Sequence, residues 1–384
     1  MGNAMKCFVA VLSASFLALT ANLPAAMADA ALNRRCDELA ASALDVDRTP
    51  GVKGIARGDI DKDKAIPACE AALKASPENA HILFTLGRAL DVTGVDVERS
   101  ATLYQKVAEA GSVVGMHNTG FAYRNAHGVK KDYALAVKWY RAAADRGFAM
   151  AQSNLGHFYR DGIGVPQDYA LAKILYEKAA ASDYAEAMND LGRLYDNGWG
   201  VKQDYAKARE WYEKAIALGD LDALNGLGWM YDRGVGGLAV DHVKANVFYK
   251  KAVDAGNAQG MDNLGESLIA GEGIAQDKAA GLALLNRAVD EGNGMAANNL
   301  AGFYARGESV DQDFVKSATF YLKAIKNGSP DAKQTLIDNR GTILDPKLLN
   351  LLQDAMQTDG LKFERATEHL SDSAVQALRE IYEP

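Results

Sequence analysis

The chain has 384 residues, of which 48% are hydrophobic and 24% are charged, so its apolar content excludes disorder along the whole length. The formal net charge of −8 argues against a nucleic-acid partner, because phosphate binding needs a basic face. Eight prolines against 36 glycines favour a helical chain in which glycine has a recurrent role.

Residues 1–28 have the features of a secretory signal peptide. Lys6 precedes an apolar run over residues 7–19, and small residues stand at positions 26 and 28. This run is shorter than the ~20 residues that a membrane-spanning helix needs. The pattern predicts cleavage after Ala28, a periplasmic or secreted mature protein, and no stable insertion into a membrane. An uncleaved membrane anchor is the alternative interpretation.

The next segment, residues 29–78, is expected to form a helical N-terminal cap that holds Cys36 and Cys69. Export places both cysteines in an oxidising compartment, where an even pair indicates one disulfide. Two free thiols are the alternative. No CxxC motif is present and neither cysteine has a histidine nearby in sequence, so a metal or catalytic role is not indicated.

Repeats occupy residues 79–328. The pattern Leu-Gly-x-x-Tyr-x-x-Gly-x-Gly-Val-x-x-Asp begins at Leu155 and again at Leu191, a step of 36 residues. Its second position recurs, at steps of 36 or 37 residues, at Gly120, Gly156, Gly192, Gly228, Gly265 and Ala301. A shorter unit places Gly87 in the same position, 33 residues before Gly120. The pattern therefore indicates seven units.

Each unit is predicted to be a pair of helices. In one unit, Ala151, Leu155 and Tyr159 recur every four residues and make one stripe of a helix. Gly162 can end that helix in the left-handed conformation, and Asp168 can cap the helix that follows. A single pair cannot bury both of its apolar stripes, so neighbouring pairs must stack. The sequence therefore predicts an all-α fold.

The repeated motif resembles the Sel1-like repeat, and residues 192–219 follow that pattern almost letter for letter. The resemblance implies an α-solenoid, a right-handed superhelix of about seven helix-turn-helix units. It also implies binding to other proteins, often in the bacterial envelope or in secretion-linked signalling. The unit at 79–111 lacks the Gly-x-Gly loop and is closer to the related tetratricopeptide repeat. Gly281 and Ala301 depart from the usual packing residues in the last two units.

The two flanks are expected to be caps. Residues 29–78 resemble the cysteine-paired module that precedes Sel1 repeats in exported alphaproteobacterial proteins. Residues 329–384 are expected to form a helical C-terminal cap, with helices near 346–358 and 371–382, because open solenoid ends must be sealed. The repeats themselves lack the cysteine pairs of disulfide-rich Sel1 relatives, so the activities of that subgroup are not carried over.

The sequence shows no motif for catalysis or for a bound metal or cofactor. Its six histidines lack metal-ligand spacing, and it has no GxSxG elbow, Walker loop or dinucleotide fingerprint. The Gly-x-Gly pairs follow a helix rather than a strand, so they are interpreted as turns rather than as phosphate loops. Recurrent aspartates such as Asp168 and Asp204 are interpreted as helix caps rather than as paired catalytic carboxylates.

The packed stripe on the first helix of each unit leaves another face free. The resemblance to Sel1-like solenoids implies that these first helices line the concave side. The predicted binding residues on that face are Asn118, Phe121, Arg124, Asn154, His157, Arg160, Asn189, Arg193, Asn225, Trp229, Asn263 and Asn299. The asparagines form a broken ladder that either pairs with an extended peptide or braces neighbouring units. Trp229 and Arg193 are favoured as binding anchors, whereas Trp139 and Trp211 are expected in the core.

These features predict a non-enzymatic periplasmic module that binds a protein or peptide in its concave groove and serves envelope assembly or signalling regulation. A cell-wall-acting hydrolase is a second hypothesis, and it would require an acid and a base that converge within the groove. A purely structural spacer is the third. The sequence carries no signal of oligomeric state.

Overall fold

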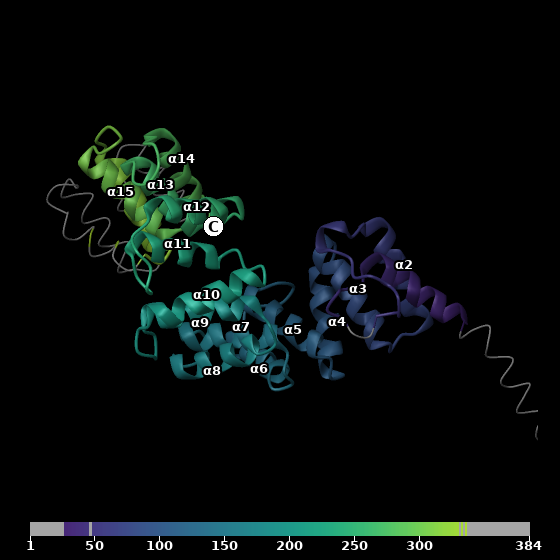
Figure 1. Cartoon of the computed structure of the whole chain (residues 1–384). Helices are drawn as coiled ribbons and strands as arrows, with labels where there is room; N and C mark the ends of the chain where they lie inside the picture. Colours follow the sequence, from purple (N-terminus) through teal and green to yellow (C-terminus); the bar gives the residue numbers. More distant parts are fainter. Residues whose placement is uncertain (1–26, 46–47, 330–331, 333–334, 336–384) are drawn as a thin grey trace, which may run out of the picture. The chain divides into compact units, whose positions relative to one another are not determined.

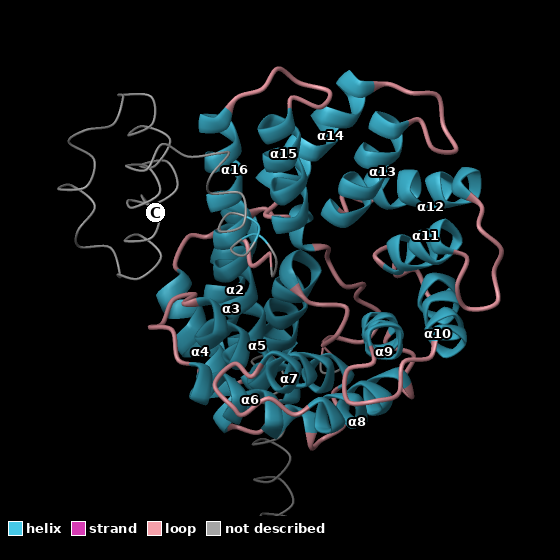
Figure 2. Cartoon of the chain, turned by 90° about the vertical axis from the view of Figure 1, so that its left-hand side faces the viewer, coloured by secondary structure: helices cyan, strands magenta, loops and turns pink. Residues whose placement is uncertain are grey.

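The computed structural model describes residues 27–45, 48–329, 332 and 335. These residues form helices and loops without any strand, as Figure 2 shows, and the predicted all-α fold is confirmed. The chain divides into two compact units, of which the first ends at Ala187 and the second begins at Met188. The apolar run of the predicted signal peptide and both predicted helices of the C-terminal cap lie outside the described residues.

In the first unit, a helix over residues 27–40 precedes a short 3-10 helix and a series of helices that pack in chain order (Figure 1). Their bounds are η1 Arg57–Asp59, α2 Lys62–Ala75, α3 Ala80–Thr93, α4 Val97–Glu109, α5 Val113–Asn125, α6 Tyr133–Ala144, α7 Ala149–Asp161 and α8 Tyr169–Ala180. Helix α9, Ala185–Asn197, contains the division between the units.

In the second unit, the helices are α10 Tyr205–Ala217, α11 Ala223–Arg233, α12 His242–Asp254, α13 Ala258–Ala270, α14 Lys278–Asp290, α15 Gly294–Arg306 and α16 Phe314–Lys326. Each of these helices packs on the next one. Each unit is therefore a stack of helical hairpins, and the predicted solenoid of helical repeats is confirmed within each.

The ends of the helices follow from the residues that the repeat places there. Gly162 ends α7 in the left-handed conformation, with φ of 68°. The side chain of Asp168 caps α8 by accepting a hydrogen bond from the backbone N–H of Leu171 (2.9 Å). Both predicted roles are confirmed. The cap is worth about 1 kcal/mol, since it satisfies an N–H that the helix leaves unpaired.

A glycine on the first helix of a repeat lets a tyrosine of the second helix come close. A Cβ atom on Gly156 would lie 2.5 Å from Cε1 of Tyr176, whose side chain is fully buried. The equivalent tyrosine of the next repeat is Tyr212, which packs on Gly192 in the same way. The aromatic residue that recurs in the core of each repeat is therefore the tyrosine that packs against this glycine.

The expectation that Trp139 and Trp211 lie in the core is wrong, because each precedes the buried tyrosine and is only half-buried. The ammonium groups of Lys138 and Lys214 lie over their rings, at 5.3 and 4.3 Å from the ring centroids. One step along a helix turns the side chain by about 100°, which is enough to move it from the core to the surface.

Replacing Gly156 with alanine is expected to lower the free energy of unfolding by up to about 2 kcal/mol. Alanine gains about 1 kcal/mol in helix propensity, but crowding the fixed ring of Tyr176 costs about 1–3 kcal/mol. Chemical denaturation measures the difference. Gly58→Ala is the matched control, because a Cβ atom there meets nothing within 4 Å. Equal stabilities of the two variants would contradict this account of the glycine.

The N-terminal segment is held to the first repeat by a covalent link and by buried polar groups. A disulfide joins Cys36, on the helix over residues 27–40, to Cys69 on α2, as predicted. The guanidinium of Arg88 on α3 is buried and donates to the backbone carbonyl oxygens of Ala40 (2.6 Å) and Ile55 (2.5 Å). These bonds satisfy carbonyl groups at the end of the N-terminal helix and in the following loop.

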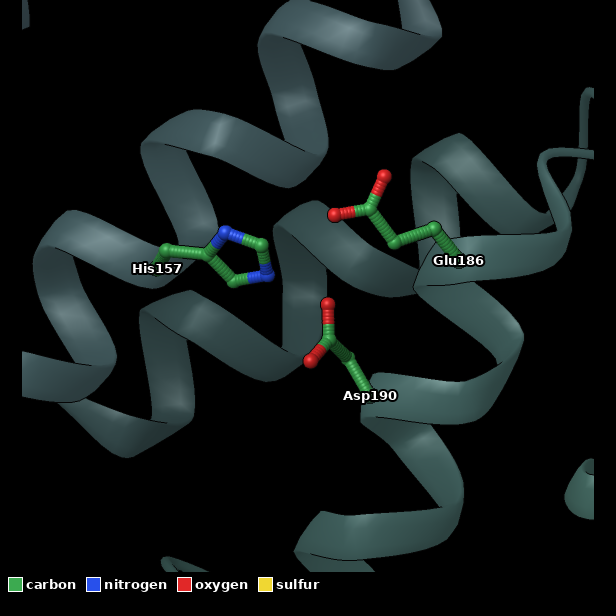
Figure 3. A group of neighbouring side chains, drawn as sticks. All are labelled: His157, Glu186 and Asp190. Carbon is green, nitrogen blue, oxygen red and sulfur yellow. The ribbon is translucent and has the colours of Figure 1, made fainter. Parts of the chain in front are cut away.

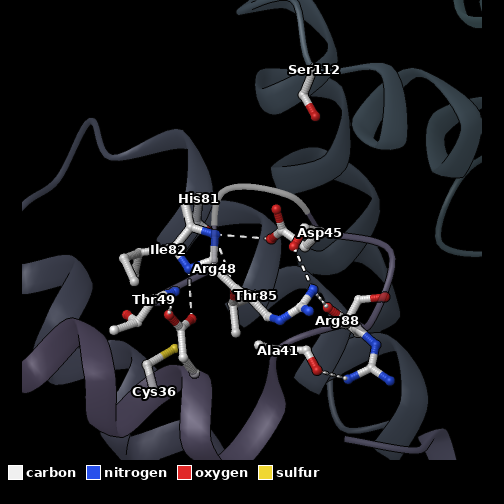
Figure 4. Close-up of polar contacts among 12 residues, drawn as sticks. Cys36, Ala41, Asp45, Arg48, Thr49, His81, Ile82, Thr85, Arg88 and Ser112 are labelled. Atoms are coloured by element: carbon white, nitrogen blue, oxygen red, sulfur yellow. Dashed lines mark hydrogen bonds and ion pairs between the residues drawn. The ribbon is translucent and has the colours of Figure 1, made fainter. Parts of the chain in front are cut away.

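A half-buried histidine, His81, lies between two aspartates and completes this attachment; Figure 4 shows it beside Asp45. Nε2 of His81 lies 2.6 Å from Oδ1 of Asp37, and Nδ1 lies 2.9 Å from Oδ2 of Asp45. Burial alone would lower the pKa of His81, but the hydrogen bonds to both carboxylates raise it to about 9. Burial would raise the pKa of Asp37, and its bonds with His81 and Thr49 more than offset this and lower it. The group is thus an ion triad at neutral pH.

None of the described helices combines the length and the apolar character that crossing a membrane would require.

Candidate binding groove

A groove with a volume of about 990 Å³ runs across the second unit. Its walls come mainly from the first helices of successive repeats, α9, α11 and α13, with Met295 and Phe303 of α15 at one end. Five of the predicted binding residues line it: Asn189, Arg193, Asn225, Trp229 and Asn263. The periodic pattern places them together because positions one repeat apart lie side by side in a stack.

Two asparagines of the groove bond to each other across neighbouring repeats. Nδ2 of Asn263 donates to Oδ1 of Asn225 at 2.8 Å. The other ends of these amides, the Nδ2 group of Asn225 and the Oδ1 atom of Asn263, have no hydrogen-bond partner in the described part of the chain. The pair therefore braces two repeats and still presents a donor and an acceptor.

Asn299 has a different position. It does not line the groove, and its Nδ2 donates to Oδ1 of Asp262 at 3.0 Å, again across neighbouring repeats. Asp262 is only 2% exposed and also accepts from Nε2 of Gln259 (3.1 Å). Burial raises the pKa of Asp262 to about 6, although both hydrogen bonds act to lower it. This part of the predicted ladder braces the structure behind the groove.

Trp229 forms part of the apolar wall. Its ring is half-buried and lies 5.9 Å from that of Tyr205, measured between centroids. It also packs against the buried cluster that contains Tyr249 and Leu264. The side chain of Arg193 is exposed at the same groove. A rigid aromatic and a guanidinium at one concave surface are the residue types that dominate protein-binding energies.

Carboxylates are concentrated around α13. Glu266 lies one turn after Asp262 on this helix and contributes to the groove. The loss of surrounding water in the concave wall raises the pKa of Glu266 to about 7, and the negative charges of Asp262, Asp232 and Glu272 act in the same direction. The cavity thus holds a carboxyl group that changes its charge close to neutral pH.

A histidine and two carboxylates meet beside Glu266. Nδ1 of His242 lies 2.8 Å from Oδ1 of Asp232, and ligand atoms of these residues and of Glu272 all lie within 4.8 Å of one another. The hydrogen bond to Asp232 raises the pKa of His242. Nitrogen and carboxylate oxygens in such a group are donors that divalent metals accept. The ion pair between His242 and Asp232 explains their proximity without a metal.

The first unit has a smaller pocket, with a volume of about 280 Å³, which contains four predicted residues: Asn118, Phe121, Arg124 and Asn154. Phe121 is 43% exposed, as a contact residue should be. Nη1 of Arg124 donates to Oδ1 of Asn154 at 2.9 Å, which links two repeats. This pocket is the counterpart of the groove at an earlier point in the repeat series.

His117 also lines this pocket, between the two asparagines. Its Nδ1 lies 3.2 Å from Oδ1 of Asn118, and its Nε2 lies 3.2 Å from Nδ2 of Asn154. Burial lowers the pKa of His117, so the ring is neutral and can donate to one asparagine while it accepts from the other. Asn154, like the asparagines of the second unit, therefore links neighbouring repeats, whereas Asn118 contacts the adjacent His117 of its own helix.

Besides Asn299, two further predicted residues lie outside both cavities. Nε of Arg160 forms an ion pair with Oδ1 of the adjacent Asp161 at 2.7 Å. A ring nitrogen of His157 lies within 4.8 Å of a carboxylate oxygen of Glu186. Figure 3 draws these two side chains with that of Asp190, which follows Glu186 by one turn of α9. His157 therefore lies near Glu186, which lines the first pocket, but does not line that pocket itself.

Sequence reasoning missed the residues that loops and second helices bring to the cavities. Glu272 follows α13, and His242 begins α12. One signal was present, because His242 stands where three other repeats have Tyr133, Tyr169 and Tyr205. In the first pocket, Arg57, Asp91 and His127 were missed; Nη2 of Arg57 and Nε2 of His127 lie 3.0 and 2.6 Å from carboxylate oxygens of Asp91.

Comparison with known proteins agrees with this architecture. A Sel1 repeat model matches residues 113–148, 149–184, 185–220, 221–257, 258–293 and 294–329, and a tetratricopeptide repeat model matches residues 59–113. The resemblance proposed from the sequence is confirmed, including the tetratricopeptide character of the first repeat. No curated protein sequence matches the chain.

Solved structures resemble the chain as well. A Sel1 repeat protein from Oxalobacter formigenes is 28% identical, with a TM-score of 0.54, and the match covers 63% of this chain and 96% of that one. The c5321 protein, a protective antigen of uropathogenic Escherichia coli strains with an SLR fold, is 23% identical. Its TM-score is 0.46, and the match covers 85% of this chain and 76% of that one.

The family follows from the extent of the match. Residues 113–329 are matched repeat after repeat, which is more than half of the 384 residues. Sel1 and tetratricopeptide repeats typically mediate protein–protein interaction and act as non-catalytic scaffolds. With its stacked hairpins and six consecutive repeat matches, the chain belongs to the Sel1 repeat family.

Proposed function

We propose that this protein is an exported, non-enzymatic interaction module that binds an extended segment of a protein partner in the groove of its second unit. It would act in the periplasm, in the assembly or signalling regulation of the cell envelope. The groove is lined by side chains of three successive first helices, most of them polar, and its aromatic wall is limited to a few side chains, which suits a peptide chain better than a compact small molecule.

The asparagine pair carries this proposal. Asn225 and Asn263 are held in place by their mutual bond, and each still offers one polar atom. An extended peptide presents an N–H and a C=O group at each residue, so the acceptor of Asn263 and the donor of Asn225 can satisfy both. Because the pair is already fixed, binding loses little side-chain entropy.

Two features support the proposed location. Residues 1–28 have the composition of a signal peptide, and the Cys36–Cys69 disulfide belongs to an oxidising compartment. The pathway follows from the resemblance to Sel1-like proteins alone.

The test is a binding measurement with a double variant. Peptides selected from a displayed random library against the full chain are measured by calorimetry with the native protein and with Trp229→Ala/Arg193→Ala. We expect a loss of at least about 30-fold in affinity, because a binding hot spot contributes about 2 kcal/mol or more. Trp211→Ala/Lys214→Ala is the control, since neither residue lines the groove.

Unchanged affinity in the groove variant, or a selection that yields no binding peptide, would contradict the proposed function. The second result would favour a structural spacer.

A further inference from the structure

The groove of the second unit has an excess of negative charge. Its lining contains five carboxylates: Asp196, Asp222, Asp232, Glu266 and Glu272. The cations that line it are Arg193, Arg233 and His242. Counting His242 as charged, the carboxylates remain in excess, so the surface attracts positive charge.

The five carboxylates differ in whether they have a hydrogen-bond or ion-pair partner within the protein. Asp196 accepts from the Tyr212 hydroxyl at 3.2 Å, and Asp222 accepts from Nδ2 of Asn257 at 2.6 Å. Asp232 is paired with His242. The carboxylates of Glu266 and Glu272 have no hydrogen-bond or ion-pair partner in the part of the chain that the structure describes. These two therefore lack a direct ion pair among the described residues, although Arg233 acts to lower the pKa of Glu266 and a ring nitrogen of His242 lies within 4.8 Å of a carboxylate oxygen of Glu272.

The pKa of Glu266 reflects the negative charge of this wall of the groove. The pKa of an exposed glutamate stays near its ordinary value of about 4.3. Glu266 is reached by solvent, yet desolvation by the groove and three neighbouring carboxylates raise its pKa to about 7. A cation placed beside Glu266 would therefore relieve repulsion among groups that are already in position.

We propose that the segment bound in this groove is basic, and that a lysine or arginine side chain of the partner lies between Glu266 and Glu272. This inference rests on the proposed function, because it specifies the chemistry of the same bound segment. Trp229 and Tyr205 would then contact the apolar part of the segment further along the wall. Charge complementarity of this kind raises the association rate and selects against acidic partners.

The affinity for a basic segment should depend on pH. A bound cation favours the ionised form of Glu266, so binding releases protons and affinity rises as pH increases from about 6 to 8. The charged or titratable groups facing Glu266 are Asp232 and Arg233 on α11, His242 and Tyr249 on α12, Asp262 on α13, and Glu272. His242 loses its positive charge as pH rises, which also strengthens the attraction between the groove and a cationic side chain of the partner.

The experiment compares three synthetic peptides of equal length, in which alternate residues are lysine, glutamine or glutamate. Binding to the full chain is followed by fluorescence anisotropy at pH 6 and pH 8 and at two salt concentrations. We expect the lysine peptide to bind at least 10-fold more tightly than the glutamine peptide, and more tightly at pH 8 and at low salt. The glutamate peptide should show no binding.

Two variants, each of which replaces two glutamates with glutamine, test whether the binding of the lysine peptide depends on the charges inside the groove. Glu266→Gln/Glu272→Gln should weaken binding of the lysine peptide at least 10-fold and reduce its pH dependence. Glu210→Gln/Glu213→Gln, on exposed positions of α10 outside the groove, should change it less than 2-fold. Equal losses in the two variants would mean that only overall charge matters, and the inference would be overturned.

The outcomes separate this inference from the proposed function. If the glutamine peptide binds as tightly as the lysine peptide, and Trp229→Ala/Arg193→Ala abolishes that binding, the groove binds peptides but does not select basic ones. If no peptide of any charge binds, and library selection fails as well, the proposed function itself is wrong.

Discussion

Replacing both cysteines in the variant Cys36→Ser/Cys69→Ser is expected to lower the free energy of unfolding of the first unit by about 3–4 kcal/mol. The disulfide closes a loop across a sequence separation of 33 residues. In the chain-entropy model, the cross-link restricts the unfolded chain, and a loop of this length corresponds to about 3–4 kcal/mol at 25 °C. Both sulfur atoms lie in the fully buried core of the N-terminal segment, so the serine hydroxyls add a desolvation cost.

The measurement is urea unfolding under non-reducing conditions, followed by hydrogen exchange of amides in α2 and α3. The native protein treated with a reducing agent should approach the stability of the serine variant, which itself should not respond to the agent. A native protein that is indifferent to reduction, with unchanged exchange in α2 and α3, would show that the disulfide contributes no stability.

The second large effect concerns the ion triad of His81, Asp37 and Asp45. We expect the stability of the first unit to fall by about 2–3 kcal/mol between pH 6.5 and pH 9. The pKa of His81 is raised from 6.5 to about 9, so the folded state holds its proton more tightly than the unfolded state does. The stabilisation is fully present below pH 6.5 and is lost as pH rises through 9, at about 1.4 kcal/mol for each pKa unit.

The variant His81→Gln tests this directly. Glutamine can donate to one carboxylate but carries no charge, so Asp37, which is fully buried, loses its cation. We expect a loss of about 3 kcal/mol at pH 6, because an unpaired buried carboxylate is costly, and a stability that no longer falls above pH 6.5. A native protein whose unfolding free energy is flat from pH 6 to pH 9 would refute the assignment.

The repeat framework could be predicted from the sequence because each part of it is local. Gly162 and Asp168 end and begin helices through contacts within a few residues, and the 36-residue period fixes which helices are neighbours. The same period placed Asn225, Trp229 and Arg193 on one face of successive repeats, and these three residues line the groove. Trp211 was placed wrongly, because two adjacent aromatic residues compete for one core position and the period alone does not choose between them.

The polar groups of the groove could not be predicted in the same way. The bond between Asn225 and Asn263 joins residues 38 positions apart, and the triad joins His81 to Asp37 across 44 positions. Such contacts depend on the rotation from one hairpin to the next, which the sequence pattern leaves open. The raised pKa of Glu266 depends on the same rotation between hairpins. It results from burial and from nearby negative charges, and one of these charges, Asp232, belongs to another repeat.

The central claim is that the inner wall of the second unit, formed by the first helices of its repeats, contacts a bound protein segment. A photo-reactive benzoylphenylalanine at position 229, in the groove, and at position 211, on α10 outside it, tests this directly. With a peptide selected against the native chain, the account predicts a covalent adduct from position 229 and none from position 211. Adducts from position 211 alone would contradict it.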